Sequence, residues 1–339
     1  MFITWVMQEK MTTMSSHICE NLCREIHADS CGELNKLGLF QELVSLSPVE
    51  CRKIRQVYMQ MYREDLYNNF KNVGNLGKVD DEKQDGSSSN SWAEVGLSML
   101  MLNPHERDAV VCREALERND VKYNVLVEIF TCRKSSHFLL IQQAYQSRFQ
   151  RHLDQDILKI EPPSPYQKLL IALSASHKAH KVELSQHIAK CDARRLFEAG
   201  EGGAGQVDEA VMLEILSKRS IAQTKLAFSS YKHIYGHSFT SLLRKRKCRE
   251  FEDAVLAVVR CISSPTKYFA EVLNGSLKSG DKEALVRIMV SRAEVDMEDI
   301  RKEFENKYSL DLKSAISECP GIPQGNYKNL LLSLLENTH

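Results

Sequence analysis

One strongly basic segment stands out among the residues that could contact a ligand. Its five cations are Arg244, Lys245, Arg246, Lys247 and Arg249. Each Lys or Arg near an anionic lipid leaflet contributes about 1 kcal/mol at most. Five of them therefore give an upper limit of about 5 kcal/mol, which is only a submillimolar affinity. The segment could favour encounters with an acidic membrane, but stable docking needs a second contact. A solvated helix end and a nuclear-localisation-like run remain open as alternatives.

Glycine-containing turns are the second group of candidate site residues. The richest glycine stretch is AGEGGAGQVDEA, residues 199–210, which contains Gly203 and Gly205. A second turn, Gly280-Asp281, precedes an apolar helix. Glycine adopts positive φ without a steric penalty, so it suits turns that present backbone carbonyls. A flexible connection between two helices is the simpler interpretation of residues 199–210.

Histidine and cysteine give little support for a metal site. His177 and His180 lie three positions apart with His187 nearby, but no acid or cysteine stands at ligand spacing, so a polar linker is the better interpretation. The ten cysteines show no paired CxxC spacing, which makes a zinc site improbable. We expect reduced cysteines in a cytosolic protein.

Several classes of function lose support from what the chain lacks. Lys plus Arg and Asp plus Glu both number 45 in 339 residues, whereas a general nucleic-acid binder would show a basic excess. No GxxxxGK[ST], GxSxG or HExxH motif is present, so we expect no enzyme activity. No apolar run is long enough to span a bilayer. Residues 1–18 lack the pattern of a signal peptide and are expected to be an N-terminal extension, with Met11 or Met14 as alternative starts.

The elements that must position these residues are helices, arranged in a recurring pair. An apolar helix that ends in arginine is followed by a helix that carries an aromatic residue. The arginines are Arg133, Arg219 and Arg292, and the aromatic residues are Tyr145, Tyr231 and Phe304, with Tyr58 in a weaker first copy. A cation at a helix end complements the negative end of the helix dipole, so we interpret the arginines as structural. We expect the aromatic residues and Met297 in the core.

Residues 279–304 show this pattern most clearly. The apolar positions at helical spacing in the first helix are Leu285, Ile288 and Met289. In the second helix, the positions expected to face inward are Val295, Met297, Ile300 and Phe304. Prolines and polar stretches then divide the chain into an extension at 1–18 and units at 19–102, 103–182, 183–263 and 264–339. Residues 72–91 are polar and rich in glycine and serine, and are predicted to be a disordered insertion.

Several segments resemble the annexin family. HERDAVVCREAL resembles the start of the second annexin repeat, and EILSKR and RIMVSRAEVDMEDIRKEF resemble parts of the third and fourth. The resemblance covers nearly the whole chain from about residue 19, and its details look like divergent plant annexins. It implies an all-α fold of four five-helix annexin repeats forming a curved disc. Helices A, B, D and E of each repeat would form a bundle, with helix C across it. The A–B and D–E loops would face an anionic phospholipid membrane, which the family binds through calcium.

The resemblance also implies where calcium would bind. Family members supply carbonyl oxygens from a glycine-containing A–B turn and a carboxylate from the D–E loop, ~40 residues later. The corresponding turns here include Cys31-Gly32 in the first repeat, Arg118-Asn119 in the second, Gly203 and Gly205 in the third, and Lys278 and Gly280 in the fourth. The acid position falls on Arg246 in the third repeat and near Glu318 or Cys319 in the fourth. Glu161 and Glu318 are candidates for shifted acids. No repeat retains the full set, so we expect weak calcium binding, lost in most repeats.

We therefore predict a cytoplasmic, peripheral membrane protein of annexin type. It would bind acidic phospholipid with degenerate calcium sites, and partly without calcium through the basic segment. The alternative is a protein-interaction scaffold that keeps the fold and has lost lipid and calcium binding. Protein partners remain open, and no nucleic-acid partner is expected.

Overall fold

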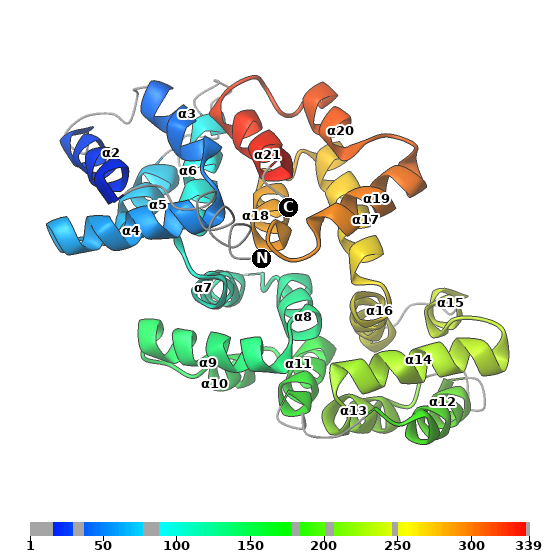
Figure 1. The fold of residues 1–339 in the computed structure, drawn as a ribbon. Coiled ribbons are helices and arrows are strands. Elements are labelled where there is room, and N and C mark those ends of the chain that lie inside the picture. Colours follow the sequence, from blue (N-terminus) through cyan, green and yellow to red (C-terminus); the bar gives the residue numbers. More distant parts are fainter. Residues whose placement is uncertain are drawn as a thin grey trace, which may run out of the picture. The chain divides into compact units, whose positions relative to one another are not determined.

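The regular structure of the chain is helical (Figure 1). The computed structural model describes residues 16–29, 37–76, 88–118, 120–177, 184–200, 207–245 and 250–336. All regular elements in these ranges are α-helices, and in chain order they form four sets of five. We number the sets repeats 1 to 4 and refer to the helices of each as A to E. This confirms the predicted all-α fold of four five-helix repeats.

The helix bounds follow the same order in each repeat. Repeat 1 contains α2 (Ser16–Asp29), α3 (Leu37–Ser45), α4 (Pro48–Tyr62), α5 (Leu66–Leu76) and α6 (Ser88–Met101). Repeat 2 contains α7 (Pro104–Leu116), α8 (Tyr123–Cys132), α9 (Ser135–Phe149), α10 (Leu153–Leu158) and α11 (Pro165–Ser176). Repeat 3 contains α12 (Gln186–Gly200), α13 (Glu209–Lys218), α14 (Ile221–Tyr235), α15 (Phe239–Lys245) and α16 (Glu250–Ser263). Repeat 4 contains α17 (Pro265–Ser279), α18 (Lys282–Arg292), α19 (Met297–Tyr308), α20 (Leu312–Glu318) and α21 (Asn326–Glu336).

The segment at 72–91, predicted to be a disordered insertion, is helical at both ends. Residues 72–76 belong to α5 and residues 88–91 belong to α6. Residues 77–87 lie outside the described part of the chain. The polar composition of 72–91 therefore does not mark the ends of helices D and E in repeat 1.

The start of α4 shows how local sequence sets a helix boundary. Ser47 accepts a hydrogen bond from the backbone N–H of Glu50, and the Glu50 carboxylate accepts one from the Ser47 N–H at 2.9 Å. Pro48 occupies the first turn, where its missing N–H has no cost. This capping box satisfies donors that the first turn of a helix otherwise leaves unpaired.

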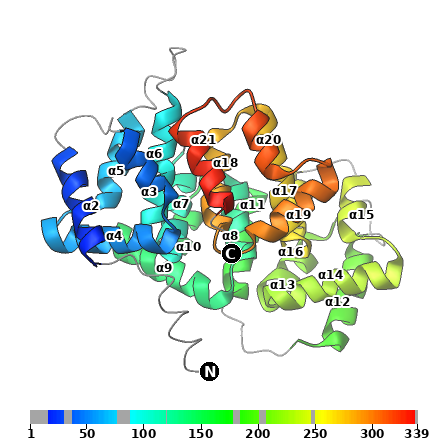
Figure 2. The ribbon, with the colours of Figure 1, turned by 45° about the horizontal axis from the view of Figure 1, so that its top comes forward.

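The chain divides into two compact units, of which unit 1 combines Met1–Pro104 with Phe269–His339. Helix E of repeat 1, α6, packs beside α18 and α21 of repeat 4 (Figure 2). Gly96 makes this approach close, because a Cβ atom there would lie 2.2 Å from Leu330 Cδ2. Ser333 of α21 donates to the Val44 carbonyl at 2.8 Å, which links repeats 1 and 4 through polar contact as well.

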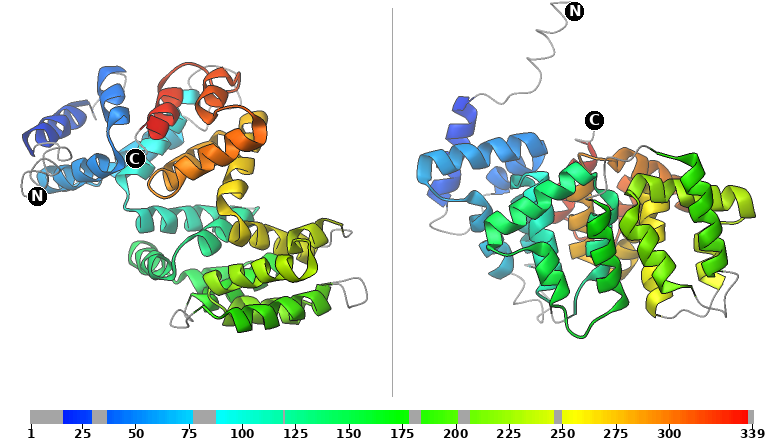
Figure 3. Two further views of the ribbon diagram at one scale, coloured as in Figure 1. Left: turned by 45° about the vertical axis from the view of Figure 1, so that its right-hand side comes forward. Right: turned by 90° about the horizontal axis from the view of Figure 1, so that it is seen from below.

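Unit 2, His105–Tyr268, contains repeats 2 and 3. Helix E of repeat 3, α16, packs against α8 and α11 of repeat 2, and α12 runs beside α14 within repeat 3 (Figure 3). Tyr268 donates to the buried carboxylate of Glu128 at 3.1 Å. Apolar residues on the facing helices, among them Leu126, Leu173 and Val258, are fully buried and form the core of this unit.

The predicted core residues are buried, with one exception. Tyr58, Tyr145 and Tyr231 are fully buried, and Met297 and Phe304 are each 1% exposed. The prediction that Val295 faces inward is wrong, because its side chain is 57% exposed. Helix α19 begins only at Met297, so Val295 lies in the preceding turn and does not follow the helical period.

Two further findings concern the described ranges. No helix there is both long and apolar enough to cross a lipid bilayer. All eight cysteines described are free thiols: Cys19, Cys23, Cys51, Cys112, Cys132, Cys191, Cys261 and Cys319.

Candidate functional site

The A–B turn and the D–E loop of repeat 4 lie against each other. Gly280 adopts φ +73°, which ends α17 and allows α18 to begin two residues later. Asp281 caps α18 by accepting from the Ala284 N–H at 3.0 Å. A Cβ atom on Gly321 in the D–E loop would lie 3.9 Å from the Gly280 Cα. The two loops that the resemblance assigns to a calcium site are therefore adjacent in this repeat.

The side chain at this contact is a thiol. Cys319 Sγ donates to the Leu277 carbonyl oxygen at 3.4 Å. Glu318, the candidate acid, is the last residue of α20 and is exposed, as is Lys278 in the last turn of α17. Tyr327 at the start of helix E donates to the Lys282 carbonyl at 3.2 Å. These contacts occupy two carbonyls near the turn with neutral donors.

In repeat 3, the structure describes the residues that flank the candidate site but not most of the candidate residues themselves. Gly203 and Gly205 lie outside the described residues, as do the cations Arg246, Lys247 and Arg249. Arg244 and Lys245 are the last residues of α15, and both are exposed. The part of the basic segment that the structure describes therefore faces solvent.

Sequence reasoning missed one carboxylate beside the A–B loop of repeat 3. Glu252 of α16 is only 5% exposed, and its Oε1 accepts from the Val207 N–H at 3.4 Å. The Asp208 N–H donates to the Ala199 carbonyl at 3.2 Å and so ties the two ends of that loop together. In the sequence, Glu252 is one of several acids in the first turn of a helix. Nothing in its local sequence therefore indicates that its side chain contacts the A–B loop.

In repeat 2 the loops make contact through aromatic rings. Tyr123, which begins α8, stacks on Tyr166 near the start of α11, with ring centroids 5.0 Å apart. The Lys122 N–H donates to the Ala115 carbonyl at 3.1 Å, which closes the A–B turn. Glu161, the other candidate acid, is exposed in the D–E loop.

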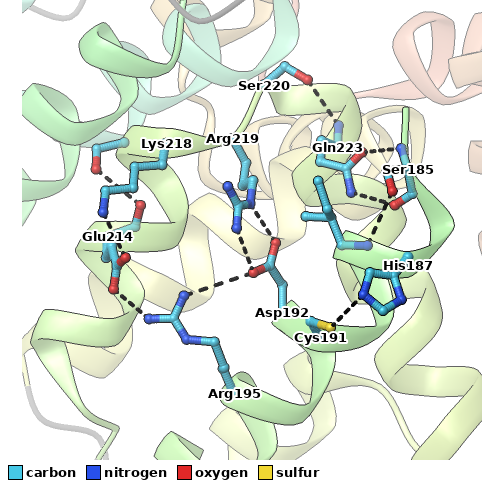
Figure 4. Close-up of polar contacts among 12 residues, drawn as sticks. Ser185, His187, Cys191, Asp192, Arg195, Glu214, Lys218, Arg219, Ser220 and Gln223 are labelled. Carbon is cyan, nitrogen blue, oxygen red and sulfur yellow. Dashed lines mark hydrogen bonds and ion pairs between the residues drawn. The ribbon is translucent and has the colours of Figure 1, made fainter. Parts of the chain in front are cut away.

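The repeated arginines are held by carboxylates, in agreement with a structural role. In repeat 3, Arg219 donates from Nε and Nη2 to Asp192 at 2.7 and 3.1 Å (Figure 4). Arg195 of α12 also bonds to Glu214 of α13, so two cations join helices A and B in this view.

In repeat 2, Arg133 makes the equivalent pair with Asp108, at 2.6 and 2.9 Å. His137 also contacts this carboxylate, at 3.1 Å. Burial alone would raise the pKa of Asp108, but Arg133 and His137 together hold that pKa well below its usual range.

The histidine cluster does not assemble. His177 is 1% exposed, and its Nε2 donates to the Phe130 carbonyl at 2.6 Å, so the polar-linker interpretation is wrong for this residue. His187 is exposed and lies 3.8 Å from Cys191 Sγ, while His180 is outside the described residues. Across the described ranges, no three side chains of His, Cys, Asp or Glu come together as metal ligands.

Known proteins with a similar sequence identify the family to which this architecture belongs. The family model named Annexin matches residues 107–173, 191–258 and 268–334. Among curated relatives, the annexin-like protein RJ4 of Fragaria ananassa is 30% identical over 286 residues, covering 84% of each chain. Annexin A13 of Homo sapiens is 28% identical over 303 residues, covering 89% of this chain and 90% of that protein.

Solved structures agree with the sequence relatives. Annexin III aligns with a TM-score of 0.77 and 27% identity, over 95% of both chains. Calcium-bound annexin (Sm)1 aligns with a TM-score of 0.68 at 19% identity, over 96% of this chain and 92% of that one, and shows a likeness of fold alone. Family-model matches over more than half of the chain, a relative at 30% identity and the four five-helix repeats lead to one conclusion: the chain belongs to the annexin family.

Proposed function

We propose that this annexin is a peripheral binder of acidic phospholipid membranes whose calcium sites are degenerate. The observation that carries the proposal is the contact between the A–B turn and the D–E loop of repeat 4. The two loops meet as a calcium site requires, yet the residue between them is Cys319, whose Sγ lies 3.4 Å from the Leu277 oxygen. A thiol donor in place of a carboxylate removes charge that a calcium ion needs, so affinity should be weak until lipid oxygens complete the shell.

We expect calcium to strengthen the binding to acidic membranes, and we expect part of this binding to occur without calcium. The solved annexin (Sm)1 binds calcium, and this chain has the same fold. Where the resemblance places an acid in repeat 3, this chain has the basic segment, of which Arg244 and Lys245 are exposed. Cations near an anionic leaflet are attracted without calcium, and this attraction is screened by salt. The proposal therefore includes a calcium-independent part that weakens as ionic strength rises.

Vesicle co-sedimentation tests the proposal. The wild-type chain is expected to bind phosphatidylserine vesicles in EGTA and to bind them more tightly in calcium. The double variant Arg244→Gln/Lys245→Gln should lose up to about thirtyfold of the affinity in EGTA, since each cation contributes about 1 kcal/mol at most. The control is Lys225→Gln/Lys232→Gln, which removes two exposed cations from α14. Binding abolished by EGTA would reject the calcium-independent part, and no binding in either buffer would favour the scaffold alternative.

A further inference from the structure

Helix D of repeat 2 ends in an exposed leucine, whereas helix D of repeat 3 and helix D of repeat 4 each end in a charged residue. Leu158 is the last residue of α10 and is 58% exposed. The last residues of α15 and α20 are Lys245 and Glu318. Pro162 and Pro163 in the same D–E loop are also exposed. Repeat 2 therefore presents apolar side chains where repeats 3 and 4 present polar ones.

This loop is held in place by one buried amide. Gln167 of α11 is 7% exposed, and its Nε2 donates to the carbonyls of Ile157, Leu158 and Ile160 at 2.8, 3.1 and 3.4 Å. Ser164 caps α11 by accepting from the Gln167 N–H at 3.3 Å. The loop thus presents its apolar side chains from a fixed backbone, which reduces the ordering cost of a contact. The same three carbonyls are already occupied by a neutral donor, so this loop offers little to a calcium ion.

An aromatic pair lies at the same end of repeat 2. The rings of Tyr123 and Tyr166 stack at an interplanar angle of 14°, and both side chains are half-buried. Burial, with Asp253 and Glu250 of α16, raises the pKa of Tyr166, so the phenol stays neutral. Neutral tyrosines with an apolar body and a polar tip are enriched at membrane–water interfaces.

The charges around this end leave a small positive excess. The A–B turn, the D–E loop and the first turn of α11 carry four cations and three acids: Arg118, Lys122, Lys159, Lys168, Glu117, Asp120 and Glu161. One cation, Lys168, bonds to Glu209 of repeat 3 at 2.7 Å. Apolar tips, interfacial aromatics and surrounding lysines together are the composition of segments that lie in a lipid headgroup region.

We infer that the loop end of repeat 2, formed by Leu158, Pro162, Pro163, Tyr123 and Tyr166, is a calcium-independent apolar contact with the interface of an anionic bilayer. The inference rests on the proposed membrane function and adds a second, non-ionic contact to it. Leu158 enters the acyl–headgroup boundary, and the tyrosines lie at headgroup level. The basic segment of repeat 3 and this apolar loop end of repeat 2, which belong to the same unit, would then both contact the membrane.

Partition onto vesicles in EGTA tests the inference with single substitutions of the full chain. Leu158→Gln is compared with Leu140→Gln, in which a leucine of α9 in the same repeat, 44% exposed, receives the same uncharged replacement. We expect Leu158→Gln to weaken partition onto phosphatidylserine-containing vesicles on the order of fivefold, as loss of a partly buried leucine would. Leu140→Gln should leave partition unchanged.

A gain-of-function variant separates the contact from a folding defect. Leu158→Trp should tighten partition, because tryptophan is favoured at the interface, and its emission should shift to the blue when vesicles are added in EGTA. Equal partition of wild type and Leu158→Gln, or an equal loss in Leu140→Gln, would overturn the apolar contact. Wild-type binding that occurs only in calcium would also overturn it, together with the calcium-independent part of the proposed function, while leaving the calcium-dependent part in place. Absence of vesicle binding in both buffers would instead reject the proposed function and the contact together.

Discussion

The guanidinium of Arg292 lies over the ring of Phe269, 4.6 Å from the ring centroid. Phe269 is the second residue of the third segment that matches the annexin model, and the second residues of the other two are Asp108 and Asp192. Those aspartates pair with Arg133 and Arg219. In repeat 4 the aspartate is thus replaced by an aromatic ring, and Arg292 takes its carboxylate from Asp296, four residues along the chain.

Asp296→Ala should therefore be strongly destabilising. The Arg292 side chain is only 4% exposed, so the substitution leaves a buried cation with an aromatic ring alone. Removal of one partner from a buried pair typically costs about 3–5 kcal/mol. Asp296 makes no side-chain hydrogen bond as helix cap, so loss of capping does not contribute.

Urea unfolding followed by tryptophan fluorescence measures this cost. Both tryptophans, Trp5 and Trp92, fall within Met1–Pro104 of unit 1, so the signal follows the unit that holds Arg292. Asp299→Ala, in the exposed first turn of the same helix, is the control and should change stability by about 0.5 kcal/mol or less. Equal costs for the two variants would mean that Phe269 alone is enough to hold the arginine.

Gly280→Ala should lower the stability of unit 1. Gly280 has φ +73°, a conformation that costs an L-residue about 1–2 kcal/mol, although its Cβ would meet no atom within 4 Å. Gly275→Ala is a matched control in α17, because its Cβ is equally unobstructed and its backbone has no positive φ. Alanine in a helix is favoured over glycine by up to about 1 kcal/mol, so the control should be stabilising. The two variants should thus shift the urea midpoint in opposite directions, and shifts of the same sign would contradict this.

Glu94 makes unit 1 less stable as pH rises. Burial raises the pKa of this carboxyl in α6 from 4.5 to about 7. The folded state then binds more protons than the unfolded state between these values, so stability falls as pH rises through that window. Glu94→Gln should stabilise the protein by about 1 kcal/mol near pH 8, a figure reduced for the partial exposure of the side chain, and should have no effect near pH 4. Unfolding curves at the two pH values check this, and a pH-independent difference between the proteins would count against it.

Cys319→Asp should restore calcium binding to repeat 4. The change places a carboxylate at the contact between the D–E loop and the A–B turn, where the thiol now meets Leu277. Additional ligand charge is a main determinant of calcium affinity, and we expect a gain on the order of tenfold. Calcium titration calorimetry in the presence of phosphatidylserine vesicles measures it. Cys191→Asp, at an exposed position in α12, is the control and should bind as the wild type does. A Cys319→Asp protein with unchanged calcium affinity would show that the turn lacks the remaining oxygen ligands.

Much of the helical architecture could be predicted because its signals are local. Apolar residues at i, i+3 and i+4 define one face of a helix, and this pattern correctly placed Tyr145, Tyr231 and Phe304 in the core. The same rule failed at Val295, where the chain leaves the helix before the period would bring the side chain inward. Residues 72–76 and 88–91 of the predicted disordered insertion belong to α5 and α6, because a polar composition does not by itself keep residues out of a helix.

The amino-acid sequence by itself determined the apolar faces of the helices and the arginines that end helix B, because each depends on residues a few positions apart. Only the tertiary structure decided which side chains meet. Arg133 and Arg219 find aspartates 25 and 27 positions away, whereas Arg292 pairs only 4 positions away. Packing of helices likewise brought Cys319, and not Glu318, to the turn at Gly280, and left Leu158 in solvent. Contacts of this kind depend on how helix faces are oriented against one another, and no local spacing encodes that orientation.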